Sequence, residues 1–328
     1  MSPKSQQEEA QRKVLIAMDG SRFASHAVDY TVNMSRFIPD LHIVLLHVLP
    51  SMPPYLEEGA RTNKGMRDKL RRLKEVNQAE GEKVLEKAKT QLVAAHVPAE
   101  RIQKKLAPRR TGLAKDIINE AERGMYDALL VGRRGLTGAQ ELFMGSVSSQ
   151  LVQHATNVPL WVIDHQVPRP RVMVAIDGSE SSLKAVDHVA FILGGNPEAE
   201  IHFLHVVPKL QNVCSIDLDE MGETLKDIEG ELEMLEQDLI QGNQACLDDF
   251  TPRATQILRQ AGFSADRITF EDREIVLGIA RTILKAAQEG GYGTIVLGRR
   301  GLGRSHFLGS VSDRVIRQAE GQAIWVVG

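Results

Sequence analysis

The residues with the clearest chemical meaning form a glycine-rich stretch, Val131–Ser148, that reads VGRRGLTGAQELFMGSVS. The apolar run Asp127–Val131 leads into it and predicts a short buried strand. Apolar residues at helical spacing follow and predict a helix that opens at Ser146. The order is therefore strand, glycine loop, and then the N-terminus of a helix.

This order predicts a phosphate cradle. The first amides of a helix have no internal partner and carry the positive end of the helix dipole. Glycines let the backbone approach a ligand closely. Ser146 is a suitable N-cap and can donate its hydroxyl to an anion. From one copy, a tight strand-to-helix turn without any ligand explains the glycines equally well.

The motif occurs a second time, at Leu297–Ser312, as LGRRGLGRSHFLGSVS. The first copy has the spacing Gly-x2-Gly-x9-Gly-Ser, whereas the second has Gly-x2-Gly-x7-Gly-Ser, so its loop is two residues shorter. Neither copy carries the Lys-Ser/Thr of a Walker A loop or the dinucleotide pattern GxGxxG.

The whole chain repeats with the motif. Asp19-Gly-Ser recurs as Asp177-Gly-Ser, and Leu46-His-Val recurs as Leu204-His-Val, both 158 residues later. A period this long describes a domain rather than a solenoid repeat. We therefore expect two domains, residues 1–165 and 166–328, joined by a short proline-containing linker that keeps them packed together.

Each copy alternates strand and helix patterns. In the first, strands are expected at 13–18, 41–49, 102–107, 128–131 and 159–163, and helices at 23–37, 63–95, 113–123 and 147–155. This alternation predicts a parallel sheet with right-handed crossovers. Asp19, Val48 and Gly132 end three different strands, and ligands of such sheets bind beyond the carboxyl ends of the strands. We expect the three to converge.

Composition narrows the function classes. The 328 residues are 42% hydrophobic and 25% charged with a net charge of −3, which fits a soluble protein and gives no case for a nucleic-acid partner. No apolar run is long enough to span a membrane, and the polar start resembles no signal peptide. Two cysteines without a CxxC pattern suit a reducing compartment, so the cytoplasm is expected.

Other candidates keep simpler explanations beside the functional one. His47 and His205 end strands, and a backbone partner is favoured over a metal because no acidic or cysteine ligand is suitably spaced. The loop arginines, Arg133-Arg134 and Arg299-Arg300, could contact phosphate, stay solvated, or form an interface. The helical segment Leu218–Leu258 is interpreted as longer packing, with a docking surface as the alternative. No catalytic triad, carboxylate pair or metal set can be assembled.

The quoted motifs resemble those of the universal stress protein family over nearly the whole chain. The resemblance implies two doubly wound α/β domains of the adenine nucleotide alpha hydrolase-like type. Each would hold a five-stranded parallel sheet in the order 3-2-1-4-5. Family members pair through their last strand, which implies an internal pseudo-dimer through Leu160–Ile163 and Ile324–Val327. Two whole chains could associate further as a homodimer.

The family's nucleotide site carries over onto matching positions. In the first domain these are Asp19, Val48, Val131, Gly132, Gly135, Gly145, Ser146 and Val147. In the second they are Asp177, Val206, Gly298, Gly301, Gly309, Ser310 and Val311. The shorter second loop offers less chain to wrap a triphosphate, so nucleotide is expected chiefly in the first domain.

We therefore expect a cytoplasmic stress-response regulator that binds ATP, ADP or AMP, with Mg²⁺ as an accompanying ion. An unidentified protein partner would read its state. At most slow ATP hydrolysis is expected, because no catalytic residue stands out. The alternative is a nucleotide-free scaffold that acts through protein contacts.

Overall fold

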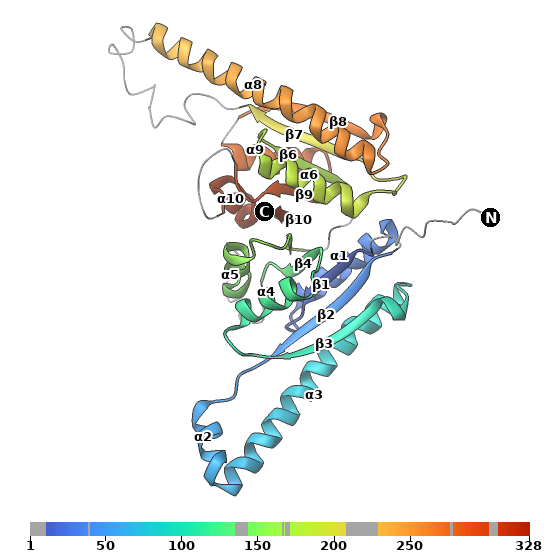
Figure 1. The fold of residues 1–328 in the computed structure, drawn as a ribbon, viewed down its shortest axis with the longest axis vertical. Helices are drawn as coiled ribbons and strands as arrows, with labels where there is room; N and C mark the ends of the chain where they lie inside the picture. The colour runs from blue at the N-terminus through green and yellow to red at the C-terminus, as the bar shows by residue number, and fades with distance from the viewer. Residues whose placement is uncertain are drawn as a thin grey trace, which may run out of the picture.

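The computed structural model describes residues 11–38, 40–134, 144–165, 167, 171–207, 229–275, 278–301 and 308–328. Within them the strands form one ten-stranded sheet in the order β3-β2-β1-β4-β5-β10-β9-β6-β7-β8. Each half follows the predicted order 3-2-1-4-5. The prediction of parallel five-stranded units is confirmed, and the two units share a single mixed sheet (Figure 1).

The first half contributes the strands β1 (Lys13–Ala17), β2 (His42–Leu49), β3 (Ile102–Pro108), β4 (Ala128–Gly132) and β5 (Leu160–Ile163). Its helices are α1 (Arg22–Phe37), α2 (Pro54–Thr62), α3 (Lys64–Ala94), α4 (Leu113–Arg123) and α5 (Ser146–His154), with a short turn η1 (Ala99–Arg101). Local chemistry sets several of these starts. Ser21 caps α1 by accepting from the amide of Ala24, and Asn63 caps α3 by accepting from the amide of Met66.

The second half repeats this pattern with β6 (Val172–Ile176), β7 (Ile201–Val207), β8 (Ile268–Glu274), β9 (Thr294–Gly298) and β10 (Ala323–Val327). Its helices are α6 (Glu180–Leu193), α8 (Glu229–Gln260), α9 (Ile279–Glu289) and α10 (Ser310–Gln318), with a short turn η3 (Ala265–Arg267). The predicted boundary between residues 165 and 166 stays a prediction.

The two halves join where β5 pairs antiparallel with β10, as predicted for the last strands. Trp161 lies opposite Trp325 in this pairing, and their rings stack with centroids 3.9 Å apart. Each indole N–H donates into the other half: Trp161 to His188 Nε2 and Trp325 to the hydroxyl of Tyr30, both at 3.0 Å. A pseudo-two-fold axis therefore passes between the tryptophans.

Helices cover both faces of the sheet. Alternate strand residues feed two hydrophobic cores, each continuous through both halves. One core lies under α1, α3, α6 and α8, and the other lies under α4, α5, α9 and α10. Burial on both faces explains the near-continuous apolar runs of the central strands.

Two expectations differ from the structure. The sequence pattern predicts no helix between residues 49 and 63, whereas Pro54–Thr62 forms α2, because Pro54 at the first helical position fits the fixed φ of proline. The segment Leu218–Leu258 is predicted to be helical and to pack along its length. In α8, however, the described side chains become buried only from Leu247 onward. The part of the segment before Glu229 lies outside the described residues.

Candidate functional site

The carboxyl ends of β6, β7 and β9 meet at a cavity in the second half. Its volume is about 290 Å³, and it opens between the strand ends and the start of α10. The lining residues include all seven positions predicted there: Asp177, Val206, Gly298, Gly301, Gly309, Ser310 and Val311. The convergence expected from strand order therefore occurs in this half, although its glycine loop is the shorter one.

Asp177 lies at the mouth of β6, where its carboxylate is held by its own loop. Its Oδ1 accepts from the amide of Ser179 at 3.1 Å and from the hydroxyl of Ser182 at 2.6 Å. Its Oδ2 points toward the glycine loop, since a Cβ built on Gly301 would lie 2.6 Å from it. A carboxylate held this way is positioned to accept hydrogen bonds from a ligand hydroxyl or amine.

The floor of the cavity is apolar and its rim is polar. Leu204, Leu297 and Ile283 supply apolar surface, while Ser182, Ser310 and Arg300 bring polar groups. Small-molecule sites commonly combine these features. Arg300 is one of the loop arginines predicted as possible phosphate contacts, whereas Ser182 was not predicted. Ser182 carries no repeat signal because alanine, Ala24, occupies the matching position.

The first half places most of its predicted residues in matching positions. Asp19 follows β1 and accepts from the amide of Ser21 at 2.9 Å, Val48 is the second-to-last residue of β2, and Gly145 precedes α5. Val131 is only 2% exposed and belongs to the core. Gly135 lies outside the described residues.

The residues of the GSVS motif take different positions at the helix start from those predicted. Gly145 and Gly309 are the N-cap residues of α5 and α10, and Ser146 is already the first helical residue rather than the cap. The second serine of each motif ties its helix to the strand end: Ser148 donates to the carbonyl of Gly132, and Ser312 donates to that of Gly298, both at 2.8 Å. The first-turn amides of both helices therefore face the strand ends.

Gly132 and Gly298 are required by packing at the strand ends. A Cβ on Gly132 would lie 2.6 Å from the backbone of Phe23, and one on Gly298 would lie 2.8 Å from the backbone of Ser181. These contacts are with the first turns of α1 and α6. Packing against these helices therefore explains both glycines, whether or not a ligand binds beside them.

The first arginine of each loop crosses into the opposite half. Arg299 donates to the carbonyls of Ala155 (2.9 Å), Val152 (2.5 Å) and Gln153 (2.7 Å) at the C-terminus of α5. Arg133 likewise donates to the carbonyls of Arg317 and Ala319 at the end of α10. Of the three roles considered for these arginines, the structure supports the interface.

Burial affects the charge of both guanidinium groups. Burial, together with the neighbouring Arg300, lowers the pKa of Arg299 to about 10. Burial also lowers the pKa of Arg133, but its ion pair with Asp164 (3.3 Å) opposes the effect. Both arginines therefore remain cationic at neutral pH and favour the negative C-terminal ends of their helices.

A comparison with family models agrees with this geometry. The universal stress protein family model matches residues 11–164 and again residues 168–326. The chain belongs to the universal stress protein family. It is a tandem member, with one family domain in each half.

Individual universal stress proteins are similar in sequence or fold. Universal stress protein YxiE of Bacillus subtilis (strain 168) is 30% identical over 149 residues, which cover 44% of this chain and 93% of YxiE. A universal stress protein from Archaeoglobus fulgidus DSM 4304 matches in fold with a TM-score of 0.62 at 19% identity, covering 97% of this chain and 98% of that one.

A family protein from Arabidopsis thaliana has been crystallised with AMP bound. It is 24% identical and covers 47% of this chain and 92% of its own, with a TM-score of 0.33.

The described histidines of this universal stress protein do not gather into a metal site. His47 Nδ1 is hydrogen-bonded to the carbonyl of Met18 at 2.8 Å, as expected for a strand-end histidine. His205 Nδ1 instead contacts Asp272 (2.9 Å), and Nε2 contacts the amide of Asn243 (3.1 Å). Among the residues the structure describes, no group of three potential ligands is suited to a metal ion. None of the described helices is long and apolar enough to cross a membrane.

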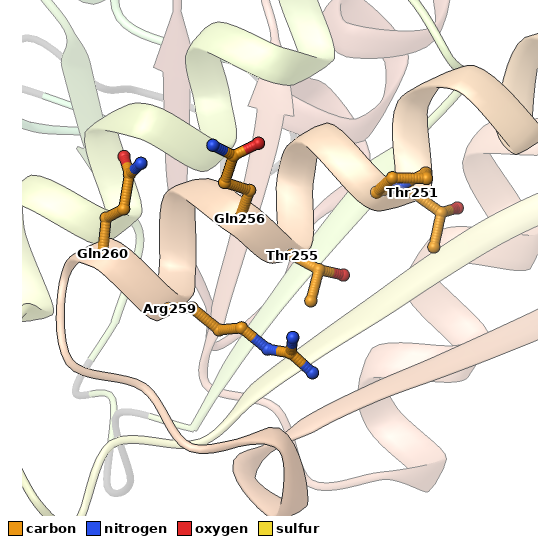
Figure 2. A pocket seen from close by; sticks show the side chains of 6 residues that line it. Thr251, Thr255, Gln256, Arg259 and Gln260 are labelled. Carbon is orange, nitrogen blue, oxygen red and sulfur yellow. The ribbon is translucent and has the colours of Figure 1, made fainter.

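A second hollow, of about 490 Å³, lies on α8 of this universal stress protein. It is lined by Thr251, Pro252, Thr255, Gln256, Arg259 and Gln260, all from one helix (Figure 2). Pro252 lies inside the helix and lacks the N–H that would bond one turn back. No predicted site residue contributes, so the strand-end cavity is the stronger candidate.

Proposed function

We propose that this universal stress protein binds adenine nucleotides, ATP, ADP or AMP, and acts as a nucleotide-responsive regulator in the stress response. The observation that carries the proposal is the cavity of the second half. Seven residues chosen from sequence as nucleotide contacts line one space at the strand ends. Ser310 and Val311 open α10 there, and the first turn of a helix favours anions.

The two halves would differ in the nucleotide they prefer. A cavity of about 290 Å³ is at the small end of ligand pockets, which run from about 300 to 1,000 Å³. Together with the loop that is two residues shorter, this supports AMP or ADP in the second half. The intact first loop supports the longer phosphate chain of ATP, with Mg²⁺ arriving on the nucleotide. The first half thus remains the proposed main ATP site.

The decisive test counts nucleotides per chain. Small molecules released from heat-denatured protein would be identified by mass spectrometry, and calorimetric titrations with AMP, ADP and ATP would follow. We expect two sites in the native chain. Gly145→Val and Gly309→Val should each remove one site, because the new side chain intrudes on a cradle. Both glycines have negative φ (−60° and −64°), so the backbone accommodates valine.

A matched control is Gly242→Val, because a Cβ at this exposed glycine of α8 meets nothing within 4 Å. It should leave both sites intact. Asp177→Asn keeps an oxygen for the amide of Ser179 but loses the charge, and should weaken binding in the second half about tenfold, the effect of a lost charge-assisted hydrogen bond. Absence of nucleotide, both in the purified protein and in titrations, would overturn the proposal in favour of a scaffold that works through protein contacts.

A further inference from the structure

We infer that Arg133 and Arg299 are positioning residues that couple the two proposed nucleotide sites. This inference rests on the proposed function. Each arginine belongs to the glycine loop of one half, and its guanidinium is buried against the other half: Arg133 is 4% exposed and Arg299 is 2% exposed. Each therefore links the loop beside one site to a helix that begins at the other.

The hydrogen bonds of the two arginines connect the two sites through α5 and α10 and lead back to the first site. The N-terminus of α5 faces the first site, and its C-terminus is held by Arg299. The backbone carbonyl of Arg299 accepts from the amide of Gly309 at 2.9 Å, and Gly309 caps α10 at the second site. The C-terminus of α10 is held in turn by Arg133. The carbonyl of Arg133 accepts from the amide of Gly145 at 3.0 Å, which returns to the first site.

The charges at the helix ends predict the sign of the cooperativity between the two sites. An anion at the N-terminus and a cation at the C-terminus both stabilise a helix. A phosphate bound at the start of α5 therefore favours the helical state that Arg299 grips. Arg299 then holds Gly309 in the position that the second site needs. Each helix has only nine residues, so a contact that orders one end also orders the other end. We expect positive cooperativity between the sites, with a coupling of about fivefold or more.

The test reads each site with the other disabled. In the Gly309→Val background only the first site binds, and Arg299→Met should weaken it about fivefold or more, although Arg299 belongs to the other half. In the Gly145→Val background, Arg133→Met should weaken the second site in the same way. Arg299→Lys, which keeps the charge, should recover part of the affinity.

Hydrogen exchange separates coupling from simple destabilisation. In the Gly145→Val protein, nucleotide at the second site should slow exchange of the α5 amides. Arg133→Met should reduce that slowing, and Arg133→Met combined with Arg299→Met should abolish it, because each arginine supplies one link between α5 and the second site. Two bound nucleotides with affinities indifferent to the remote arginines would overturn this inference and leave the proposed function standing. A chain that binds no nucleotide would overturn both.

A second proposal comes from the outer helices. We propose that two copies of this chain associate by docking a basic arm on an acidic arm. The basic arm, residues 61–76 at the tip of the α2–α3 hairpin, holds seven basic and two acidic residues. The acidic arm, residues 229–246 of α8, holds five acidic residues and no basic one. The two arms lie at opposite ends of the molecule, so they pair between copies (Figure 1).

The arms present matching stripes at helical spacing. Lys69, Arg72, Leu73 and Val76 fall on one face of α3, and Glu233, Glu236, Gln237 and Ile240 fall at the same spacing on α8. Val76 is 57% exposed and Ile240 is 46% exposed, whereas neighbouring Arg71 is already paired with Asp68 at 3.2 Å. Opposite charge beside exposed apolar side chains suits helix-on-helix docking. The α3 part of the basic arm, residues 64–76, gives roughly 20 Å of helix for the contact, so the contact is small and salt-sensitive.

Charge reversal tests this docking. Sedimentation should give the native protein a mass above its 36.3 kDa monomer at low salt, falling to the monomer as salt rises from about 0.05 to about 0.5 M. Lys69→Glu with Arg72→Glu, and separately Glu233→Lys with Glu236→Lys, should each weaken association at least tenfold. Mixing the two variants, or combining all four changes in one chain, should restore it.

These positions are exposed or half-buried, so unchanged circular dichroism serves as the control for folding. A native protein that stays monomeric at low salt would overturn the proposal, as would association that ignores all four reversals. A monomer whose basic arm binds a DNA duplex would replace it with a nucleic-acid partner.

Discussion

His188 lies in the interface between the two halves, where burial changes its pKa. It occupies the position in α6 that Tyr30 occupies in α1, and both accept a hydrogen bond from a tryptophan of the other half. Its side chain lies in the core beside the stacked Trp161 and Trp325. Burial lowers the pKa of His188 to about 3, so it stays neutral at physiological pH.

This histidine should make the protein sensitive to acid. In the unfolded chain it takes up a proton near its usual pKa of about 6.5, whereas in the folded chain it does so only near pH 3. Stability should therefore fall as pH drops through this window, with a slope of up to about 1.4 kcal/mol per pH unit. His188→Gln retains an acceptor for Trp161 but cannot titrate, so its stability should fall less steeply. Urea unfolding from pH 7.5 to 4.5 would measure both slopes, and parallel lines would contradict the assignment.

At the scale of elements, the strand–helix contacts explain which glycines the fold itself needs. The sequence grouped Gly132 and Gly298 with the ligand loop because they begin it. In the structure they admit the first turns of α1 and α6 against the strand ends. Gly309, in contrast, has room for a Cβ, with its nearest neighbour at 3.5 Å.

Alanine substitution should separate these two roles. Gly298→Ala places a methyl group 2.8 Å from the backbone of Ser181 and should destabilise the fold by about 1–3 kcal/mol, as overpacking does. Gly309→Ala should cost less than about 1 kcal/mol, the loss of a weak N-cap. Chemical denaturation of the two variants beside the native protein makes the comparison. Equal costs would mean that α6 can shift away from β9.

At the scale of the molecule, the β5–β10 pairing makes two domains into one body. Each half alone would expose a strand edge that carries a large aromatic side chain, Trp161 or Trp325. The unpaired backbone groups of such an exposed edge readily hydrogen-bond to a strand of another chain. The pseudo-two-fold axis indicates what that partner would be, because the two edges are nearly equivalent.

The first half expressed alone, residues 11–165, should therefore form a two-fold dimer through its own β5. Sedimentation should give twice the mass of the half, and Trp161→Glu should give the monomer, since a charge cannot be buried in the stack. A folded monomer of the native half would show that the β5 edge is not sufficient for pairing.

Much of the fold was predictable because its signals are local. Alternating apolar runs and caps such as Ser21 located most strands and helices, and the repeat implied that both halves share one order. Helix α2 was missed because a proline-rich stretch looks like a loop when its neighbours are unknown. The exposed part of α8 was missed because a helical pattern does not say whether anything packs against it.

The sequence by itself determined that one domain is written twice and that the ends of its first, second and fourth strands would meet, since parallel strands end at one edge. In the second half they meet at Asp177, Val206 and Gly298. It could not determine the role of Arg133 or Arg299. Their partners are main-chain carbonyls 144 to 186 residues away, and such carbonyls leave no mark in a sequence. Tertiary structure decided that role, because only the antiparallel pairing of β5 with β10 brings each arginine to the end of the opposite helix.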